Sequence, residues 1–454
     1  MILAQFIFGF VFLCADEWRA GVGKANITPT TPMWMSGYAS RDRPAEGKLT
    51  DLWVKAVVLG DQKSPQAAIL AFDLVGLDHD TGEALAGLAM KTLKLPREGV
   101  LLNCSHTHSG PVVRGNLAPM YSLDASQQSL VERYGRFLEA QTKVALEAAV
   151  KNCALAKLSF ADDSTTIAVN RRNNPELTVD VLRAADSLEG PVDHRIRLLA
   201  IEDGAGKLKA IIHSYACHAT VLDGFEWCGD YPGYANIELE RRHPAAMAVF
   251  LAGCGGDQNP LPRRTVKLAQ QYGATLADGV DRALAKPRKA ISSGVTFRAF
   301  ERAPLHFATI PNEADLNRAE ASKNKYEAAR ARLLKKQLAS DGKIADHYPF
   351  PVMTWRLGKE LTWVALGGEV VVDYSLRIQK EFGDDLWTLG YSHEVMAYIP
   401  SERILKEGRY EGETSMLYYG LPSKWRGGAE EAVFGTVARQ IGLMKDPQAE
   451  IPKP

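Results

Sequence analysis

The stretch Leu101-Leu102-Asn103-Cys104-Ser105-His106-Thr107-His108-Ser109-Gly110-Pro111 carries an apolar run into two histidines and ends at a Gly-Pro break. If residues 99–105 form a buried strand, its period of two places His106 and His108 on the same side, at the strand's end. Such a pair can share one metal ion, or one histidine can bind metal while the other moves a proton. Taken alone, it is equally consistent with two hydrogen-bonded histidines at a strand terminus.

Strands and helices alternate on both sides of this stretch. Strand, helix, strand in succession predicts a parallel crossover that ends on the strand before His106. The sequence therefore predicts an α/β fold with a mixed, largely buried β-sheet flanked by helices and a metal site at strand ends. The patterns that support it are a strand pair at 52–59 and 67–74, helices at 81–93 and 128–151, and a hairpin of 195–201 with 208–215.

Composition narrows the class of protein. The chain has 454 residues, of which 46% are hydrophobic and 24% charged, and its 54 basic residues balance its 54 acidic ones. This is typical of a globular protein with a large core, and it offers no basic surface for nucleic acid. No linker interrupts residues 20–445, which we expect to form one catalytic domain. Within it, the charged, alanine-rich part of 312–345 predicts a solvated helix in a surface insertion, and 446–454 is a polar tail.

The chain begins with an apolar run over residues 1–14. It resembles the hydrophobic region of a secretory signal peptide, although no positive residues precede it, and it is too short for an ordinary transmembrane span. We therefore expect residues 1–19 to direct the protein to a secreted or periplasmic location. An amphipathic or buried N-terminal helix is the alternative.

The six cysteines form no Cys-x-x-Cys pair, which argues against a structural zinc knuckle. Cys104, Cys217 and Cys254 lie in apolar, strand-like runs, so we expect them to be small buried residues. An alternative mechanism would use Cys254 as a nucleophile with a histidine as its base.

Histidine or glutamate follows an apolar strand at His106, His218 and Glu369. In an α/β sheet, the strand ends at one edge form the active-site crevice. Two histidines and a carboxylate are the usual protein ligands of a catalytic zinc ion. The loop after residues 246–252 contains Gly255, Gly256 and Asp257, and it either presents amides to a ligand or is a plain turn.

Short motifs in order along nearly the whole chain also resemble one enzyme family. The chain is similar to the N-terminal catalytic domain of the neutral/alkaline, non-lysosomal ceramidases, and its His-Thr-His-Ser-Gly-Pro element is specific. The matching segments are Gly21 to Ala25, Met35 to Tyr38, Ser105 to Pro111, Asn170-Arg171, His218, Gly233 to Ala235, Gly256-Asp257, Gly368-Glu369, Tyr398 and Arg409 to Gly412.

The resemblance implies an amidohydrolase with one zinc ion that cleaves the N-acyl bond of a sphingoid lipid. It implies that the zinc ligands are His106, His218, Glu369 and Tyr398. It places His108 and Arg171 beside the substrate, where Arg171 supports the oxyanion and His108 carries a proton to the leaving amine.

Two departures from the family pattern concern the substrate. Asn259 stands where the ceramidases have a catalytic serine, and the immunoglobulin-like C-terminal domain of those enzymes is not expected in this chain. We therefore expect a zinc hydrolase that acts on an amide or ester of a small-molecule or lipid-like acyl compound, with Asn259 as an oxyanion donor. A true ceramidase acting on sphingolipid, and an exported zinc-containing binding protein without catalysis, are the alternatives. The oligomeric state is left open.

Overall fold

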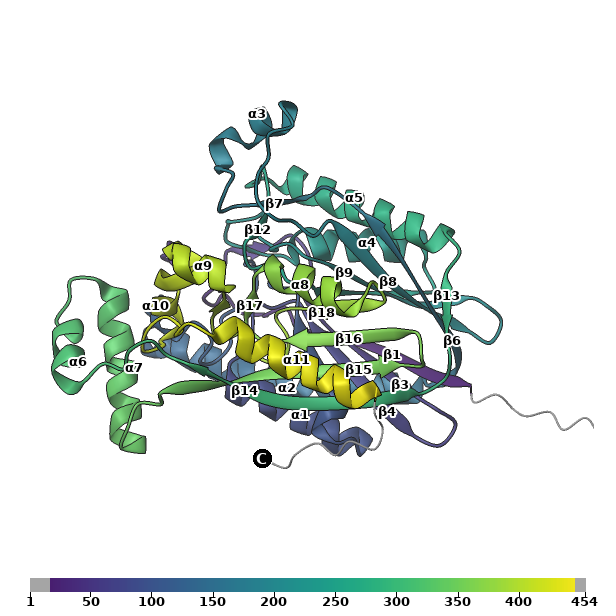
Figure 1. Cartoon of the computed structure of the whole chain (residues 1–454), viewed down its shortest axis with the longest axis horizontal. Helices are drawn as coiled ribbons and strands as arrows, with labels where there is room; N and C mark the ends of the chain where they lie inside the picture. The colour runs from purple at the N-terminus through teal and green to yellow at the C-terminus, as the bar shows by residue number, and fades with distance from the viewer. Residues whose placement is uncertain (1–16, 446–454) are drawn as a thin grey trace, which may run out of the picture.

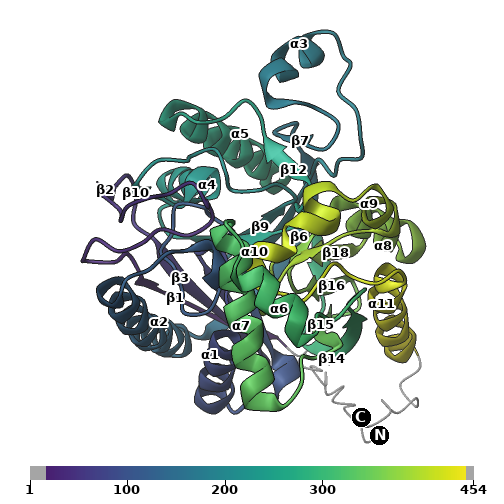
Figure 2. The ribbon, with the colours of Figure 1, turned by 90° about the vertical axis from the view of Figure 1, so that its left-hand side faces the viewer.

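The computed structural model describes residues 17–445 and shows an αββα sandwich, in which two facing β-sheets are covered by helices on their outer sides (Figures 1 and 2). The mixed α/β architecture predicted from the sequence is confirmed. Most of the predicted signal segment and the whole tail lie outside the described residues. Trp18 already belongs to the first strand.

The first sheet has nine strands within residues 17–445. The pairs β4/β5 and β9/β11 are parallel and lie at opposite edges, whereas the strands between them pair antiparallel. Helix α1 (His79–Leu93) connects β4 to β5 as the predicted parallel crossover. In spatial order the strands are β11 (Met247–Ala252), β9 (Leu208–Tyr215), β8 (Arg195–Asp203), β6 (Ala154–Ser164), β1 (Trp18–Asn26), β3 (Trp53–Gly60), β4 (Pro65–Phe72) and β5 (Val100–Cys104), with β13 (Lys289–Ile291) beside β6.

The second sheet consists of β14 (Val295–His306), β15 (His347–Leu357), β16 (Leu361–Leu366) and β18 (Leu386–Leu389). Its inner face packs on the first sheet through a row of stacked indoles. The rings of Trp355 and Trp363 lie 6.3 Å apart, and those of Trp363 and Trp387 lie 5.3 Å apart. Burying rings of this size gives the interface between the sheets a large hydrophobic contribution.

The period-two pattern of the strands separates the layers. Along β3, Val57 and Leu59 face the second sheet, whereas Val54, Ala56 and Val58 face the helices. The outer side of the first sheet is covered by α1, α2 (Ala125–Lys151), α4 (Asp230–Arg242) and α5 (Val266–Ala285), and that of the second by α8 (Val372–Phe382) and α11 (Ala429–Lys445).

The remaining elements are short, and all but the one that leads into the start of β5 lie in loops at the end of the sandwich where β5, β9 and β11 end. They are β2 (Gly47–Lys48), η1 (Arg97–Gly99), η2 (Ala118–Met120), β7 (Ala168–Asn170), η3 (Glu176–Thr178), α3 (Val179–Ala184), β10 (Glu226–Trp227), β12 (Gln258–Pro260), β17 (Glu369–Val370), β19 (Tyr398–Ile399), α9 (Glu402–Glu407), η4 (Tyr410–Thr414) and α10 (Met416–Tyr419). Two pairs matter for the site: β7 is antiparallel to β12, and β17 is parallel to β19.

The two edges of the first sheet meet at one buried side chain, Asn103 of β5. Its Oδ1 accepts a hydrogen bond from Ala252 N at the end of β11, and its Nδ2 donates to Gly390 O after β18. The first sheet therefore curls around the second, and the ends of β5, β9 and β11 converge. This closure brings histidines from opposite edges of the sheet to one place.

The charged insertion forms two helices, α6 (Glu313–Glu320) and α7 (Lys325–Asp341), where the sequence predicts one. The break occurs because the side chain of Asn324 accepts hydrogen bonds from Tyr326 N and Glu327 N and so starts a new helix. The insertion projects beside α10 (Figure 2), where Tyr326 donates to Ala39 O at 2.8 Å and its ring contacts Tyr418.

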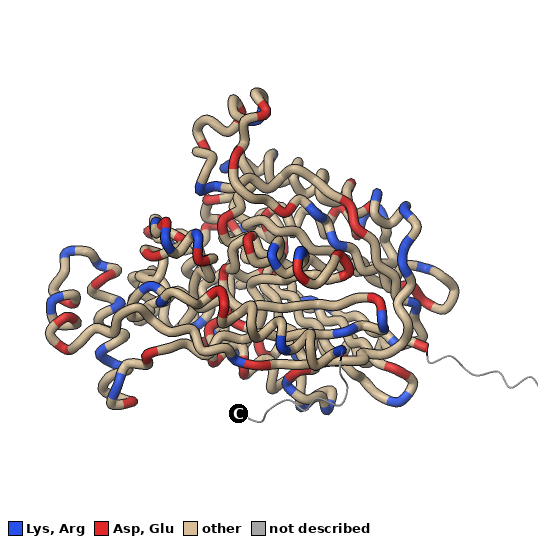
Figure 3. The backbone as a smooth tube through the Cα atoms, viewed as in Figure 1, with Lys and Arg blue, Asp and Glu red and all other residues tan. Residues whose placement is uncertain are grey.

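The surface carries both signs of charge. Lysine, arginine, aspartate and glutamate are interspersed over the face seen in Figure 3. Among residues 17–445, no helix is both long and apolar enough to span a bilayer.

Candidate metal centre

Loops that follow converging strands deliver the central side chains. His106 follows β5 and His218 follows β9, while Glu369 and Tyr398 are paired residues of the short strands β17 and β19. All four side chains are buried. The structure thus brings together four residues that are far apart in the sequence, and they are the four that were predicted as metal ligands.

The polar atoms of these side chains face one another closely. Oε2 of Glu369 lies 3.0 Å from Nε2 of His106 and 2.9 Å from Nε2 of His218. The hydroxyl of Tyr398 lies 3.2 Å from the same atom of His218. The donors of His106, His108 and His218 lie close enough to serve one metal ion.

Hydrogen bonds on the far side of both rings fix which nitrogen faces the centre. Nδ1 of His106 donates to Val75 O at 2.5 Å, and Nδ1 of His218 donates to Gly255 O at 2.7 Å. In a neutral imidazole this leaves Nε2 with a lone pair. Burial, with Arg171 nearby, lowers the pKa of His218 to about 4, so this ring is neutral near pH 7.

Two imidazole lone pairs and a carboxylate oxygen within about 3 Å repel one another unless a cation lies among them. The residues present therefore fit a metal ion. Carbonyl oxygens that hold the far nitrogen of a ligating histidine are the usual support for such a site.

Tyr419, which is not among the site residues predicted from the sequence, also reaches the centre. Its hydroxyl donates to Oε1 of Glu369, the carboxylate oxygen that faces away from His218. Tyr419 is at the end of the short helix α10. Neither a motif nor a strand end precedes it, so nothing in the sequence marks it.

His108 lies beside the cluster, on the side of Gly37. Its Nε2 is 3.1 Å from Nε2 of His106, and its buried Nδ1 has no partner among the described residues. A Cβ on Gly37, whose φ is 96°, would come within 2.5 Å of the imidazole, so glycine is needed there. Burial lowers the pKa of His108 well below its usual range, which keeps the ring neutral.

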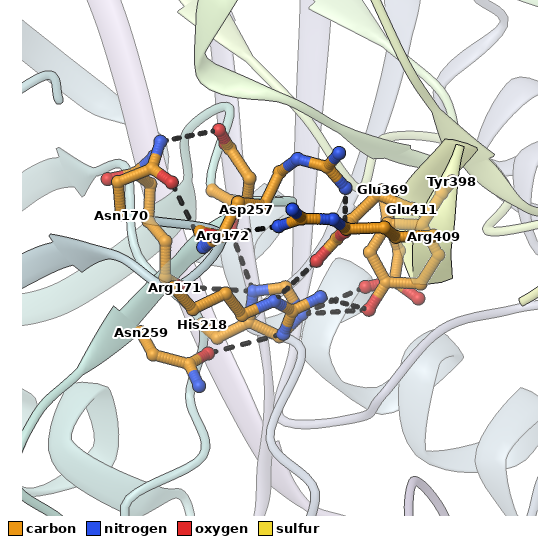
Figure 4. Close-up of polar contacts among 12 residues, drawn as sticks. Asn170, Arg171, Arg172, His218, Asp257, Asn259, Glu369, Tyr398, Arg409 and Glu411 are labelled. Carbon is orange, nitrogen blue, oxygen red and sulfur yellow. Dashed lines mark hydrogen bonds and ion pairs between the residues drawn. The ribbon is translucent and has the colours of Figure 1, made fainter. Parts of the chain in front are cut away.

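Arg171 connects the cluster to the neighbouring loop (Figure 4). Its Nη2 donates to the hydroxyl of Tyr398 at 3.1 Å, its Nη1 to Oδ1 of Asn259 at 3.2 Å, and its Nε to Glu411 at 2.8 Å. Asn259 is in β12, which pairs with β7 immediately before Arg171. The structure therefore places Arg171 and Asn259 side by side at the edge of the cluster.

The glycine loop supports the cluster from behind. Gly255 O accepts the hydrogen bond from Nδ1 of His218. Gly256 N donates to Val370 O, so this amide is not free to bind a ligand. A Cβ on Gly256 would lie 2.6 Å from Glu369 O, which explains the glycine. Asp257 accepts from Asn170 Nδ2 and Val372 N, so its carboxylate ties β7 to α8. An oxyanion role for this loop stays a prediction.

The cysteine alternative finds no support in the structure. Cys254 is completely buried in the core beneath the second sheet, and burial raises the pKa of its thiol well above the usual range. A reactive cysteine needs an accessible, stabilised thiolate. Cys104 and Cys217 are also buried, as predicted.

Comparisons with known proteins agree with this geometry. Residues 18–256 match the family model described as neutral/alkaline non-lysosomal ceramidase, N-terminal. The neutral ceramidase of Pseudomonas aeruginosa has a similar fold, with a TM-score of 0.70 and 18% identity over 97% of this chain and 76% of that one. A ceramidase complexed with C2 gives a TM-score of 0.70 and 17% identity over 97% and 77% of the two chains. No curated protein sequence matches.

Proposed function

Because the chain belongs to the family of neutral/alkaline non-lysosomal ceramidases, which are hydrolases, we propose that it is a zinc-dependent hydrolase that cleaves an amide or ester bond of an acylated substrate. The observation that carries this proposal is the contact of two imidazole lone pairs with one carboxylate oxygen at 3.0 and 2.9 Å. Nitrogen and oxygen donors of this kind suit zinc. The proposed ligands are His106, His218, Glu369 and Tyr398.

Zinc bound at this site would supply Lewis acidity and lower the pKa of a water molecule. In the net reaction the oxygen of water adds to the carbonyl carbon, the bond from carbon to nitrogen or oxygen breaks, and the leaving group departs with a proton. His108 is our candidate for carrying that proton, since its ring is neutral, lies beside the cluster and has a free buried Nδ1 in the described structure.

Charge that develops on the carbonyl oxygen needs hydrogen-bond donors that are already in place. Arg171 is positively charged and is held by Glu411. Because Oδ1 of Asn259 accepts from Arg171, the amide nitrogen of Asn259 is left to donate to a ligand. We propose that these two side chains stabilise the oxyanion, and that Asn259 does so without forming a covalent intermediate.

The proposal is tested by metal analysis combined with turnover. We expect the purified protein to contain an equimolar amount of zinc, and a chelator to remove both the zinc and the hydrolysis of an acyl amide or ester, with recovery when zinc is added. His106→Ala and His218→Ala should lose both, whereas His243→Ala, at the end of α4 and paired with Asp281, should lose neither.

Full activity in chelator, or in the His218→Ala variant, would overturn the zinc mechanism. Zinc binding without turnover on ceramide, N-acyl amines and acyl esters would instead identify a zinc-containing binding protein. Activity on ceramide alone would identify a true ceramidase.

A further inference from the structure

A second group of metal-ligating side chains lies apart from the buried metal centre. In the described part of the chain, two groups place three ligand atoms within 4.8 Å of one another. One is the buried histidine cluster, and the other consists of His306, Asp346 and His347. The second group lies at the end of β14 and the start of β15, where the helical insertion leaves the second sheet (Figure 1).

The two histidines are held close together by the pairing of their strands. His306 and His347 lie directly opposite each other on antiparallel strands. The hydrogen bond from Phe307 N to Asp346 O, at 3.0 Å, joins the residues that flank them, so the two histidines form a non-hydrogen-bonded pair. Side chains approach each other most closely at such pairs. Both imidazoles therefore extend from one face of the sheet, with their ring centroids 5.3 Å apart.

Asp346 adds a carboxylate to the two imidazoles. Its Oδ1 accepts a hydrogen bond from Nδ1 of His347 at 2.7 Å. A metal ion that replaced this proton would gain a nitrogen and an oxygen ligand with little movement of either side chain, because metal binding releases the protons of its ligands. Imidazole nitrogens together with a carboxylate oxygen suit zinc, whereas calcium and magnesium prefer oxygen ligands alone.

The backbone that carries these side chains is fixed, and the side chains themselves are accessible. His306 O accepts a hydrogen bond from Arg426 N at 2.8 Å, so the end of β14 is held on both sides. The side chains of His347 and Asp346 are 45% and 73% exposed. An ion can therefore reach the group from solvent and keep water as its remaining ligands.

We propose that His306, Asp346 and His347 form a second zinc site, at the base of the helical insertion. The ion joins the two segments through which α6 and α7 are attached to the sheet, and so stabilises the hairpin at that end. The inference does not depend on the proposed hydrolase function, since none of the three residues belongs to the buried metal centre.

Zinc binding by protein purified without a histidine tag tests this site. Equilibrium dialysis against graded concentrations of free zinc should show two equivalents in the natural protein, the second bound more weakly because its ligands are exposed. His306→Ala and His347→Ala should each lose the second equivalent and keep the first, whereas His218→Ala should lose only the first. Asp346→Asn should weaken the second equivalent at least about tenfold, the loss usual for a group that supports a metal ligand.

His243→Ala is the matched control. His243 also pairs with a carboxylate, that of Asp281, at 2.7 Å, but it belongs to neither ligand group of the described chain, so its replacement should leave both equivalents. A single equivalent in the natural protein, or a second equivalent that survives in His306→Ala or His347→Ala, would overturn the inference. Zinc that is lost from His347→Ala but unaffected by His218→Ala would support this site and contradict the proposed catalytic centre.

Hydrogen exchange provides a second, local measurement. The amide of Phe307 donates to Asp346 O beside the histidine pair, so it reports opening of the hairpin at this point. Zinc should slow its exchange in the natural protein and leave it unchanged in His347→Ala. Equal slowing in both proteins would place the ion elsewhere and overturn the inference.

Discussion

Tyr419 shows how a single hydroxyl can control a metal site from outside the ligand set. It donates to the oxygen of Glu369 that faces away from His218, and so fixes the orientation of the carboxylate. Tyr419→Phe should lower the affinity for zinc by about 10- to 100-fold, as measured by competition with a chelating dye. The adjacent Tyr418 has no hydrogen bond from its hydroxyl in the described structure, so Tyr418→Phe is the matched control. Equal zinc affinities in the two variants would contradict this role.

Asn259 allows a direct test of oxyanion stabilisation. Asn259→Asp keeps the shape of the side chain but removes the amide donor and adds negative charge beside Arg171. We expect kcat to fall by about 100-fold with zinc content unchanged, because the side chain stabilises the transition state and is not a ligand. Steady-state kinetics with metal analysis of the same preparation provides both values. An unchanged kcat would remove Asn259 from the mechanism.

Some site residues can be predicted because they directly follow an apolar strand in the sequence. Others have no such pattern before them. His106, His218 and Glu369 each follow an apolar strand, so the sequence alone nominates them, and the structure places them in contact. Tyr398 is predicted only from the family resemblance, because β19 has two residues and is too short to be recognised from the sequence pattern. Tyr419 depends on how α10 packs, which no local pattern encodes.

At the scale of elements, Asn103 carries the closure of the first sheet. Replacing it by leucine would leave Ala252 N buried without its partner, and Gly390 O would keep only the hydrogen bond from the hydroxyl of Ser392. We expect Asn103→Leu to lower the free energy of unfolding by about 3 kcal/mol in urea denaturation. Asn152→Leu, at an exposed asparagine with one side-chain hydrogen bond, should cost less than about 1 kcal/mol. Similar losses in both variants would show that Asn103 does not hold the edges together.

The elements themselves are largely predictable from periodicity, and their assembly is not. The β3–β4 hairpin, the β4–α1–β5 crossover and the β8–β9 hairpin follow from apolar patterns and turn residues. The insertion differs, because capping by Asn324 divides one predicted helix into two. The curl of the first sheet and its packing on the second arise from contacts between distant residues, so a single sequence does not reveal them.

At the scale of the whole molecule, one buried histidine makes stability depend on pH. Nε2 of His213, in β9, donates a hydrogen bond to Oδ1 of Asn236 at 2.9 Å, and burial lowers the pKa of His213 to about 4. In the unfolded chain the pKa returns to about 6.5, so between these values the unfolded state binds more protons. The free energy of unfolding therefore falls as the pH drops through this window, by up to about 3 kcal/mol from this group.

Comparison of urea denaturation at pH 7.5 and 5.0, with chelator present, tests this contribution. The loss of stability on acidification should be about 2 kcal/mol smaller in His213→Gln than in the natural protein. The comparison uses the change with pH, so any fixed cost of the substitution cancels. Parallel pH profiles would exclude His213 as the group responsible.

The helical insertion departs from His306 and returns at His347, two residues that are directly paired across β14 and β15. The hairpin is thus already closed beneath it, and the sheet has no need of the intervening residues. An insertion placed in this way can be lengthened, shortened or exchanged during evolution while the pairing of β14 with β15 stays the same. Through Tyr326 it contacts Tyr418, the neighbour of the residue that orients Glu369. A change in the insertion can therefore reach the metal centre through two neighbouring tyrosines without altering the sheet.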